Sequence, residues 1–169
     1  MIVYHIDRAG SLCEGMELTL SADGLSRHGQ HYWGSPGVEN IPEINNSFIE
    51  HIFEEVRLAH YPDRPSRFTS LFGSPTLTQL NYWGTTLKEA EDPPVWQIDS
   101  PSVWLADAAL LRCMEADTYN LARARSNAHR YWQDASKYDL AAKSCVPALL
   151  ACPSVEALIA LPARVLYRF

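Results

Sequence analysis

Residues 46–72, NSFIEHIFEEVRLAHYPDRPSRFTSLF, decide the fold class of this chain, because a helical pattern is followed in them by a strand pattern. Apolar side chains recur three and four residues apart from Phe48 to Val56, which predicts an amphipathic helix capped by Asn46 or Ser47. The polar side of this helix is predicted to carry Glu50, Glu54 and Glu55. Pro62 and Pro65 follow, and each disfavours helical backbone at the residue before it. RFTSLF at 67–72 alternates enough to predict a short strand.

The rest of the chain alternates short strands with separated helices, which is typical of an α+β fold. It has no regular strand–helix repeat and no G-x-G-x-x-G loop, so a doubly wound sheet is not favoured. Glycines and prolines interrupt any period in 21–46, which predicts a long loop with at most short turns. Further strands are predicted at 1–6, 16–20, 95–98, 146–151, 155–161 and 165–169, the last as an edge strand. Further helices are predicted from residue 74 or 76 to 83 and over 118–133, and 104–114 fits a helix or a strand followed by a helix.

Length and composition limit the class of protein. A chain of 169 residues fits one domain spanning 1–169. The net charge of −6 and the pI of about 5.4 argue against a broad nucleic-acid-binding surface, which needs basic residues to displace counterions. The N-terminal stretch lacks a basic segment followed by an apolar one, and no run of about eighteen apolar residues occurs. We therefore expect a cytoplasmic chain, or one delivered into a target cell without a cleavable signal peptide.

Several residues invite a metal or nucleophile interpretation, and the sequence gives it little support. His28 and His31 lie on a glycine-rich stretch without a third ligand nearby, so we expect a polar, solvent-exposed loop and no metal. Ser70 has no G-x-S-x-G around it and no neighbouring base, which argues against a serine hydrolase. The four cysteines form no C-x-x-C pair, which favours a reducing compartment. Cys113 and Cys145 lie among apolar residues and are expected to be buried.

His5 and Arg67 are polar residues whose surroundings require partners. His5 lies near the end of the first predicted strand between apolar neighbours, and a buried imidazole has to form hydrogen bonds. It is either a core histidine with a satisfied partner or a binding residue. Arg67 opens the strand predicted at 67–72, where its guanidinium can meet phosphate oxygens or pair with a glutamate of the preceding helix. The residues alone leave these alternatives open.

Several motifs occur in one order along the chain: YHID near the start, EEVRLAHYPDRPSRFTSLFGSPTLTQLNYW at 54–83, AD at 106–107 and AHRYWQ at 128–133. Together they resemble a family of small bacterial proteins of unknown function, and the resemblance covers most of the chain. That family is similar to the diphtheria-toxin-like branch of the ADP-ribosyltransferase superfamily. The resemblance implies a split mixed or antiparallel sheet flanked by helices.

The resemblance also implies how NAD would be held. In that branch a first-strand histidine bonds the adenosine ribose, an aromatic ring stacks on nicotinamide, and a late glutamate takes the hydroxyl of the nicotinamide ribose. His5 matches the histidine, and Phe72 or Phe68 matches the aromatic residue. The other residues implied to bind NAD or to support the site are Ser66, Arg67, Ser70 and Asp107.

The expected catalytic glutamate is the point where the chain departs from the family pattern. In the segment 146–150, Ala148 occupies the position at which that glutamate is expected. Without the carboxylate, NAD cleavage should be slowed severely, because the lost interaction acts mainly in the transition state. Three alternatives stay open: an enzyme silenced by engineering, a natural pseudoenzyme, or a site in which Glu156 supplies the acid.

The resemblance therefore implies an NAD-dependent ADP-ribosyltransferase or NAD glycohydrolase, such as a bacterial toxin, effector or defence protein. NAD would be its substrate, and the chemistry requires no metal. The expected partners are a protein acceptor rather than nucleic acid and an antitoxin or immunity protein, with no membrane. The alternative is a non-catalytic nucleotide-binding or protein-binding module on the same fold, which Ala148 would suit.

Overall fold

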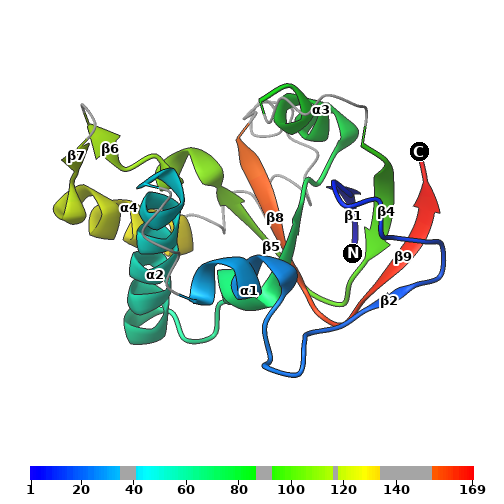
Figure 1. Cartoon of the computed structure of the whole chain (residues 1–169), viewed down its shortest axis with the longest axis horizontal. Coiled ribbons are helices and arrows are strands. Elements are labelled where there is room, and N and C mark those ends of the chain that lie inside the picture. The colour runs from blue at the N-terminus through cyan, green and yellow to red at the C-terminus, as the bar shows by residue number, and fades with distance from the viewer. Residues whose placement is uncertain (35–40, 87–92, 116–117, 134–153) are drawn as a thin grey trace.

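A computed structural model shows a mixed α+β architecture in which antiparallel sheets are flanked by helices (Figure 1). In Figure 1 the helices α2 and α4 stand on one side, a sheet that includes both chain ends stands on the other, and β5 and β8 lie between them. The α+β class predicted from the sequence is therefore confirmed. The structure describes residues 1–34, 41–86, 93–115, 118–133 and 154–169.

The first sheet, called sheet A, has four strands in the order β1-β4-β9-β2, and its pairings are antiparallel. Its strands are β1 (Ile2–Ile6), β4 (Val95–Asp99), β9 (Ala163–Arg168) and β2 (Glu17–Leu18). The prediction of an edge strand at 165–169 is wrong, because the short β2 pairs with the beginning of β9 at Ala163 and Arg164. β9 is thus an inner strand.

The second sheet, called sheet B, has three antiparallel strands in the order β3-β8-β5. Its strands are β3 (Ser70–Gly73), β8 (Val155–Ala160) and β5 (Val103–Asp107). A separate two-stranded ribbon is formed by β6 (Met114–Glu115) and β7 (Thr118–Tyr119). In sheet B, β8 pairs along both of its edges, so it forms the centre of the sheet.

The two sheets are joined where β1 passes the end of β3. The backbone N–H of Tyr4 donates to the carbonyl of Ser74 at 2.9 Å, and the N–H of Ser74 donates to the carbonyl of Tyr4 at 2.8 Å. A side chain at Gly73 would place its Cβ 2.5 Å from the Tyr4 carbonyl oxygen. Glycine is therefore required at this junction, since backbones approach too closely there for any Cβ.

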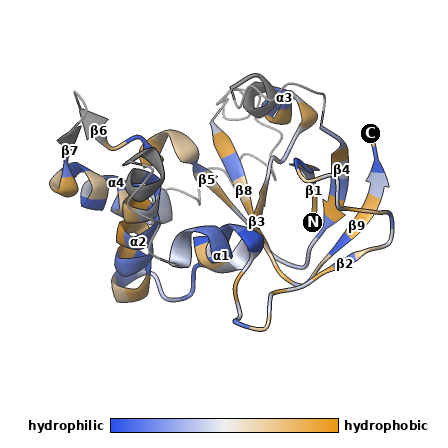
Figure 2. Cartoon of the chain, in the orientation of Figure 1, coloured by the Kyte–Doolittle hydropathy of each residue, from blue (hydrophilic) through white to orange (hydrophobic). Residues whose placement is uncertain are grey.

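Alternating residues of sheet B face two separate apolar clusters, as expected for strands buried on both sides. Between the sheets, Val3 and Ile98 of sheet A pack with Leu105 and Ile159 of sheet B. On the opposite face, Leu158 of β8 packs against the helices α2 (Ile41–His60) and α4 (Leu121–Gln133). Figure 2 shows that α2 and α4 carry both apolar and polar residues, as amphipathic helices do.

Helix α3 (Leu77–Thr86) is the short helix expected after β3.

The long loop predicted for 21–46 is wrong, because α1 (Arg27–Trp33) forms inside it and α2 begins at Ile41. The carbonyl oxygen of Phe68 accepts from the N–H of Ser26 at 2.9 Å and from its hydroxyl at 3.0 Å. A Cβ on Gly29 would overlap the same carbonyl oxygen. Helix α1 is therefore fixed by tertiary docking through a glycine, which an apolar periodicity does not reveal.

The strand predicted at 67–72 is right only in its second half. Residues Arg67–Thr69 form a 3-10 helix, η1, because the Ser66 hydroxyl accepts from the N–H of Phe68 at 3.1 Å and caps the turn. The ambiguous segment 104–114 resolves into β5 followed by a second 3-10 helix, η2 (Ala108–Leu111). The strand predicted at 146–151 lies outside the described residues.

Cys113 is buried, as predicted, whereas Cys145 lies outside the described residues. Over the described ranges, no helix combines the length and the apolar composition needed to cross a bilayer.

Candidate functional site

Arg67 lies at the centre of a buried polar cluster, and the local turn explains how it gets there. The Ser66 cap and the bond from the Ser70 hydroxyl to the Ser66 carbonyl, at 2.7 Å, fix the turn η1. The Arg67 side chain then extends between α2 and sheet B and is only 3% exposed. A buried guanidinium requires charged partners.

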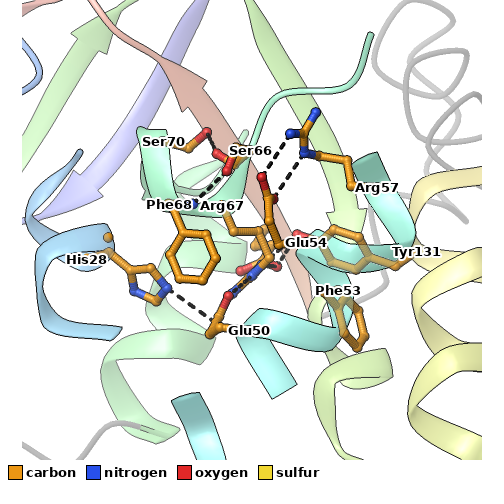
Figure 3. Close-up of polar contacts among 12 residues, drawn as sticks. His28, Glu50, Phe53, Glu54, Arg57, Ser66, Arg67, Phe68, Ser70 and Tyr131 are labelled. Carbon is orange, nitrogen blue, oxygen red and sulfur yellow. Dashed lines mark hydrogen bonds and ion pairs between the residues drawn. The ribbon is translucent and has the colours of Figure 1, made fainter. Parts of the chain in front are cut away.

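Each nitrogen of the Arg67 guanidinium has an acceptor within the protein (Figure 3). Nε and Nη2 donate to the two carboxylate oxygens of Glu50 at 2.7 and 2.9 Å, which is the paired geometry that arginine prefers. Nη1 donates to the Tyr131 hydroxyl at 2.6 Å and to Oε1 of Glu156. Of the two alternatives left open for Arg67, the structure shows the pairing with a glutamate of the preceding helix.

The opposite charges of this cluster shift the pKa values of Glu50 and Arg67 so that both stay ionised. Burial alone would raise the pKa of Glu50, but the charge of Arg67 and the contact with His28 outweigh it and lower that pKa to about 2. Burial alone would lower the pKa of Arg67, and the carboxylates of Glu156 and Glu50 instead raise it well above its usual value. One guanidinium thus faces two carboxylates, and the His28 ring borders one of them.

Tyr131 connects the arginine to Glu156. Its hydroxyl accepts from Arg67, so its own proton points to Oε1 of Glu156, at 2.6 Å. Burial, first, and then the neighbouring Glu156 raise the pKa of Tyr131 well above its usual value, so the phenol stays protonated. Glu156 lies on the central strand β8 and keeps 8% of its surface exposed.

Phe72 and His5 lie next to this cluster, at the junction of the sheets. The Arg67 guanidinium carbon lies 4.7 Å from the centre of the Phe72 ring, and the His28 ring lies 4.5 Å from it. His5 Nδ1 is 2.6 Å from the Phe72 carbonyl oxygen and must carry the proton, because a carbonyl can only accept. Burial lowers the pKa of His5, which favours the neutral ring with a lone pair on Nε2.

The other residues singled out from the sequence have structural partners. Ser66 and Ser70 bond the backbone of η1, and Phe68 is 1% exposed, with its ring 5.1 Å from that of Trp33. Asp107 accepts from the Ala109 N–H and the Ser154 hydroxyl and caps η2. Ala148, the position expected to hold the acid, lies outside the described residues.

His28 and His31 lie on the helix α1, so the prediction that they belong to a loop is wrong; His31 is solvent-exposed as predicted, whereas His28 is partly buried. Nε2 of His28 lies 3.2 Å from Oε1 of Glu50, at the rim of the buried cluster. Among the described residues, no three side chains of the metal-binding types gather into a site.

Glu50 and Tyr131 were not singled out from the sequence, although both contact Arg67. Glu50 was expected on the polar side of the helix and Tyr131 in the apolar core. A usable signal was present for Glu50, because it lies three residues before the apolar Phe53, and residues three apart share a face of a helix. Nothing in the sequence around Tyr131 distinguishes it from a packing residue.

A second buried ion pair provides a comparison inside the same molecule. Nε and Nη2 of Arg57 donate to the Glu54 carboxylate at 3.0 and 2.8 Å, and Nη1 donates to the carbonyls of Pro62 and Arg64. These contacts fix the chain between α2 and η1 and touch neither Tyr131 nor Glu156. The Arg57 pair is therefore structural.

A surface hollow of about 730 Å³ borders Met1, Asp99 and Arg164, at the other end of β1 from His5. The amino group of Met1 pairs with Asp99 at 3.1 Å. The hollow is remote from the buried cluster, and we assign it no chemistry.

The low pKa of Glu50 predicts acid-sensitive stability. The folded-state pKa of about 2 lies below the ordinary value of 4.5, so this contribution is present above pH 4.5 and is lost as the pH falls toward 2. Its size is about 3 kcal/mol. Urea unfolding between pH 7 and pH 2.5 should show a steeper loss of unfolding free energy for the wild type than for Glu50→Gln. Equal pH dependence would contradict the assignment.

Residues 28–146, more than half of the chain, match a family model described as "Protein of unknown function (DUF2441)". The matched range includes Glu50, Arg67 and Tyr131 and excludes His5 and Glu156. No curated protein matches the chain.

Proposed function

Since the chain belongs to the DUF2441 family of proteins of unknown function, we propose its activity from the residues of its own site. The proposed activity is transfer of ADP-ribose from NAD to an acceptor, or hydrolysis of NAD. Glu156 is the proposed acid. The observation that carries this proposal is the double anchoring of Glu156 Oε1 by Tyr131 and Arg67, beside Phe72 and close to the strand that holds His5. An oriented carboxylate in a shielded site is what stabilisation of a developing positive charge requires.

The carboxylate of Glu156 suits this reaction. In NAD the nicotinamide ring is cationic, and the ribose becomes oxocarbenium-like as the ring leaves. The bond between ribose C1′ and the ring nitrogen breaks, and the nitrogen keeps the electron pair as neutral nicotinamide. Water or an acceptor nucleophile adds to C1′ and releases its proton to solvent. Glu156 would take a ribose hydroxyl and stabilise the positive charge at C1′.

His5 and Phe72 supply the two other roles implied by the resemblance. With its proton on Nδ1, His5 offers Nε2 as an acceptor for a ribose hydroxyl. Phe72 offers an aromatic ring for stacking, although His28 and Arg67 already lie against that ring. We also propose that the α+β fold is an ADP-ribosyltransferase-like split sheet. The support for this is the junction of β1 with β3, which brings His5 and Phe72 together.

A buried polar atom on the same face of β1 as His5 supports a ligand at this junction. Trp96 Nε1 is buried and has no hydrogen-bond partner in the described part of the chain. Trp96 pairs with His5 in the register of β4 and β1, so the two side chains lie on the same face of sheet A. Such a group is costly to leave unsatisfied, and a polar ligand would satisfy it.

A non-catalytic nucleotide-binding or protein-binding module is the second candidate. The observation that favours it is the engagement of Arg67, which directs four of its five N–H donors to protein acceptors and so has a structural role in the cluster. In that case the buried cluster would only stabilise the fold, and Ala148 would mark the lost acid. The partner would be a protein, consistent with the acidic net charge.

Nicotinamide release from NAD separates these candidates when wild type and Ala148→Glu are compared, with and without a cell lysate as acceptor. Turnover by the wild type is expected if Glu156 is the acid. Turnover by Ala148→Glu alone would place the acid at position 148. If neither folded protein releases nicotinamide, the enzyme proposal fails and the binding module stands.

A further inference from the structure

The orientation of Glu156 depends on a small number of contacts. Tyr131 Oη, at 2.6 Å, and Nη1 of Arg67 both reach Oε1. Both contacts engage Oε1, and Oε2 is the oxygen that this inference assigns to the ligand. A carboxylate held by one oxygen presents the other in a fixed direction, which is the preorganisation that an electrostatic catalyst requires.

The hydrogen bond from Tyr131 to Glu156 can run in only one direction. Arg67 has no acceptor, so at its contact with Tyr131, at 2.6 Å, the hydroxyl accepts. A phenol has a single proton, and that proton is then committed to Glu156. Arg67 itself is held by the paired bonds to Glu50, so both donors to Oε1 arrive from groups already fixed.

The Tyr131 ring is fixed as firmly as its hydroxyl. It is 1% exposed and stands edge-on to Phe53 at 5.3 Å and to Trp132 at 4.6 Å. Phe53 belongs to α2 and Trp132 to α4, so the packing of the two helices sets the position of the phenol. A phenylalanine would keep this packing and lose only the hydroxyl.

We propose that Tyr131, supported by Arg67, is a positioning residue that aims Glu156 at the nicotinamide ribose. This inference rests on the proposed function and extends it to a residue that need not touch NAD. Tyr131 acts on the rate through Glu156, so it affects kcat and leaves the affinity for NAD unchanged.

The test compares Tyr131→Phe with Tyr61→Phe. Tyr61 also packs against the cluster between α2 and α4, and its hydroxyl lies 3.2 Å from His129 Nδ1 and is bonded there instead of to Glu156. Tyr131→Phe is expected to lower kcat for nicotinamide release about 10- to 100-fold with KM within about twofold, as for loss of a hydrogen bond to a charged group. Tyr61→Phe should leave both constants within about twofold.

Arg67→Lys and Arg57→Lys form a second matched pair, which keeps the proposal testable if Tyr131→Phe does not fold. A lysine keeps the charge but cannot reach Glu50 and Glu156 in the same paired geometry. Arg67→Lys should therefore lower kcat, whereas Arg57→Lys, which changes only the contacts of Glu54 and the following loop, should not.

Three results would overturn the inference. The first is an unchanged kcat in Tyr131→Phe or, if that variant does not fold, in Arg67→Lys. The second is an equal loss of kcat in the matched control, and the third is an effect confined to KM. In each of these the wild type turns NAD over, so the proposed function survives. A wild type without turnover would overturn both the function and this inference.

Discussion

Glu156→Gln is expected to lower kcat for nicotinamide release about 100- to 10,000-fold and to change the KM for NAD by less than about threefold. The amide has nearly the same shape as the carboxylate, so the ring of Tyr131 and the strand β8 should stay in place. It lacks the negative charge that opposes the positive charge at C1′, and this interaction is stronger in the transition state than in the bound substrate. A loss in kcat without a loss in binding is therefore the expected signature.

Steady-state nicotinamide release measures this effect, and Glu54→Gln is its control. Glu54 is also a buried carboxylate held by an arginine, at 2.8 and 3.0 Å from Arg57, and it does not contact Tyr131 or Glu156. The control should lose stability and keep its kcat. If Glu156→Gln retains the wild-type kcat, the carboxylate on β8 is not the catalytic acid.

Arg67→Met is expected to lower the free energy of unfolding by about 3–5 kcal/mol, the loss found when one member of a buried ion pair is removed. Methionine fills much of the same volume, so packing against Phe72 and Tyr131 is largely kept. The carboxylates of Glu50 and Glu156 would then lose the guanidinium that both contact, at exposures of 6% and 8%. Both would have to take up protons or admit water.

Urea denaturation at pH 7 measures the loss, with Arg125→Met as the matched control. Arg125 donates to Glu55 at 3.0 Å, but their side chains are 50% and 60% exposed. Solvent screens such a pair, so the control should lose less than about 1 kcal/mol. The triple change Arg67→Met, Glu50→Gln and Glu156→Gln should recover part of the lost stability. Equal losses for Arg67→Met and Arg125→Met would show that water reaches the cluster.

The fold could be predicted from the sequence where local pattern and tertiary packing agree. The apolar spacing from Phe48 to Val56 predicted the helix α2, and short apolar or β-branched runs predicted the strands β1, β4 and β8. Helix α1 was missed because RHGQHYW has no apolar period and depends on the docking of Gly29 against Phe68. The inner position of β9 was missed because β2 is too short to stand out in the sequence.

The candidate site was predictable only in part, because its residues are joined by long-range contacts. Arg67 and His5 were recognised as polar groups in apolar strands, and each has the partner that burial requires. Glu50 was assigned to the polar side of the helix because its partner lies 17 positions away in the chain. Tyr131 and Glu156 come from two elements that no sequence period relates, and only the fold brings them within 2.6 Å.

The positions of β8 and β9 bear on how this protein is synthesised. β8 fills the centre of sheet B, and β9 lies between β4 and β2 in sheet A. Neither sheet can be completed until residues 155–168 have left the ribosome. A nascent chain that stops earlier exposes the pairing edges of β3, β4 and β5 at the same time. Unpaired strand edges tend to associate with other chains, so a ribosome paused before residue 155 leaves this protein most dependent on chaperones.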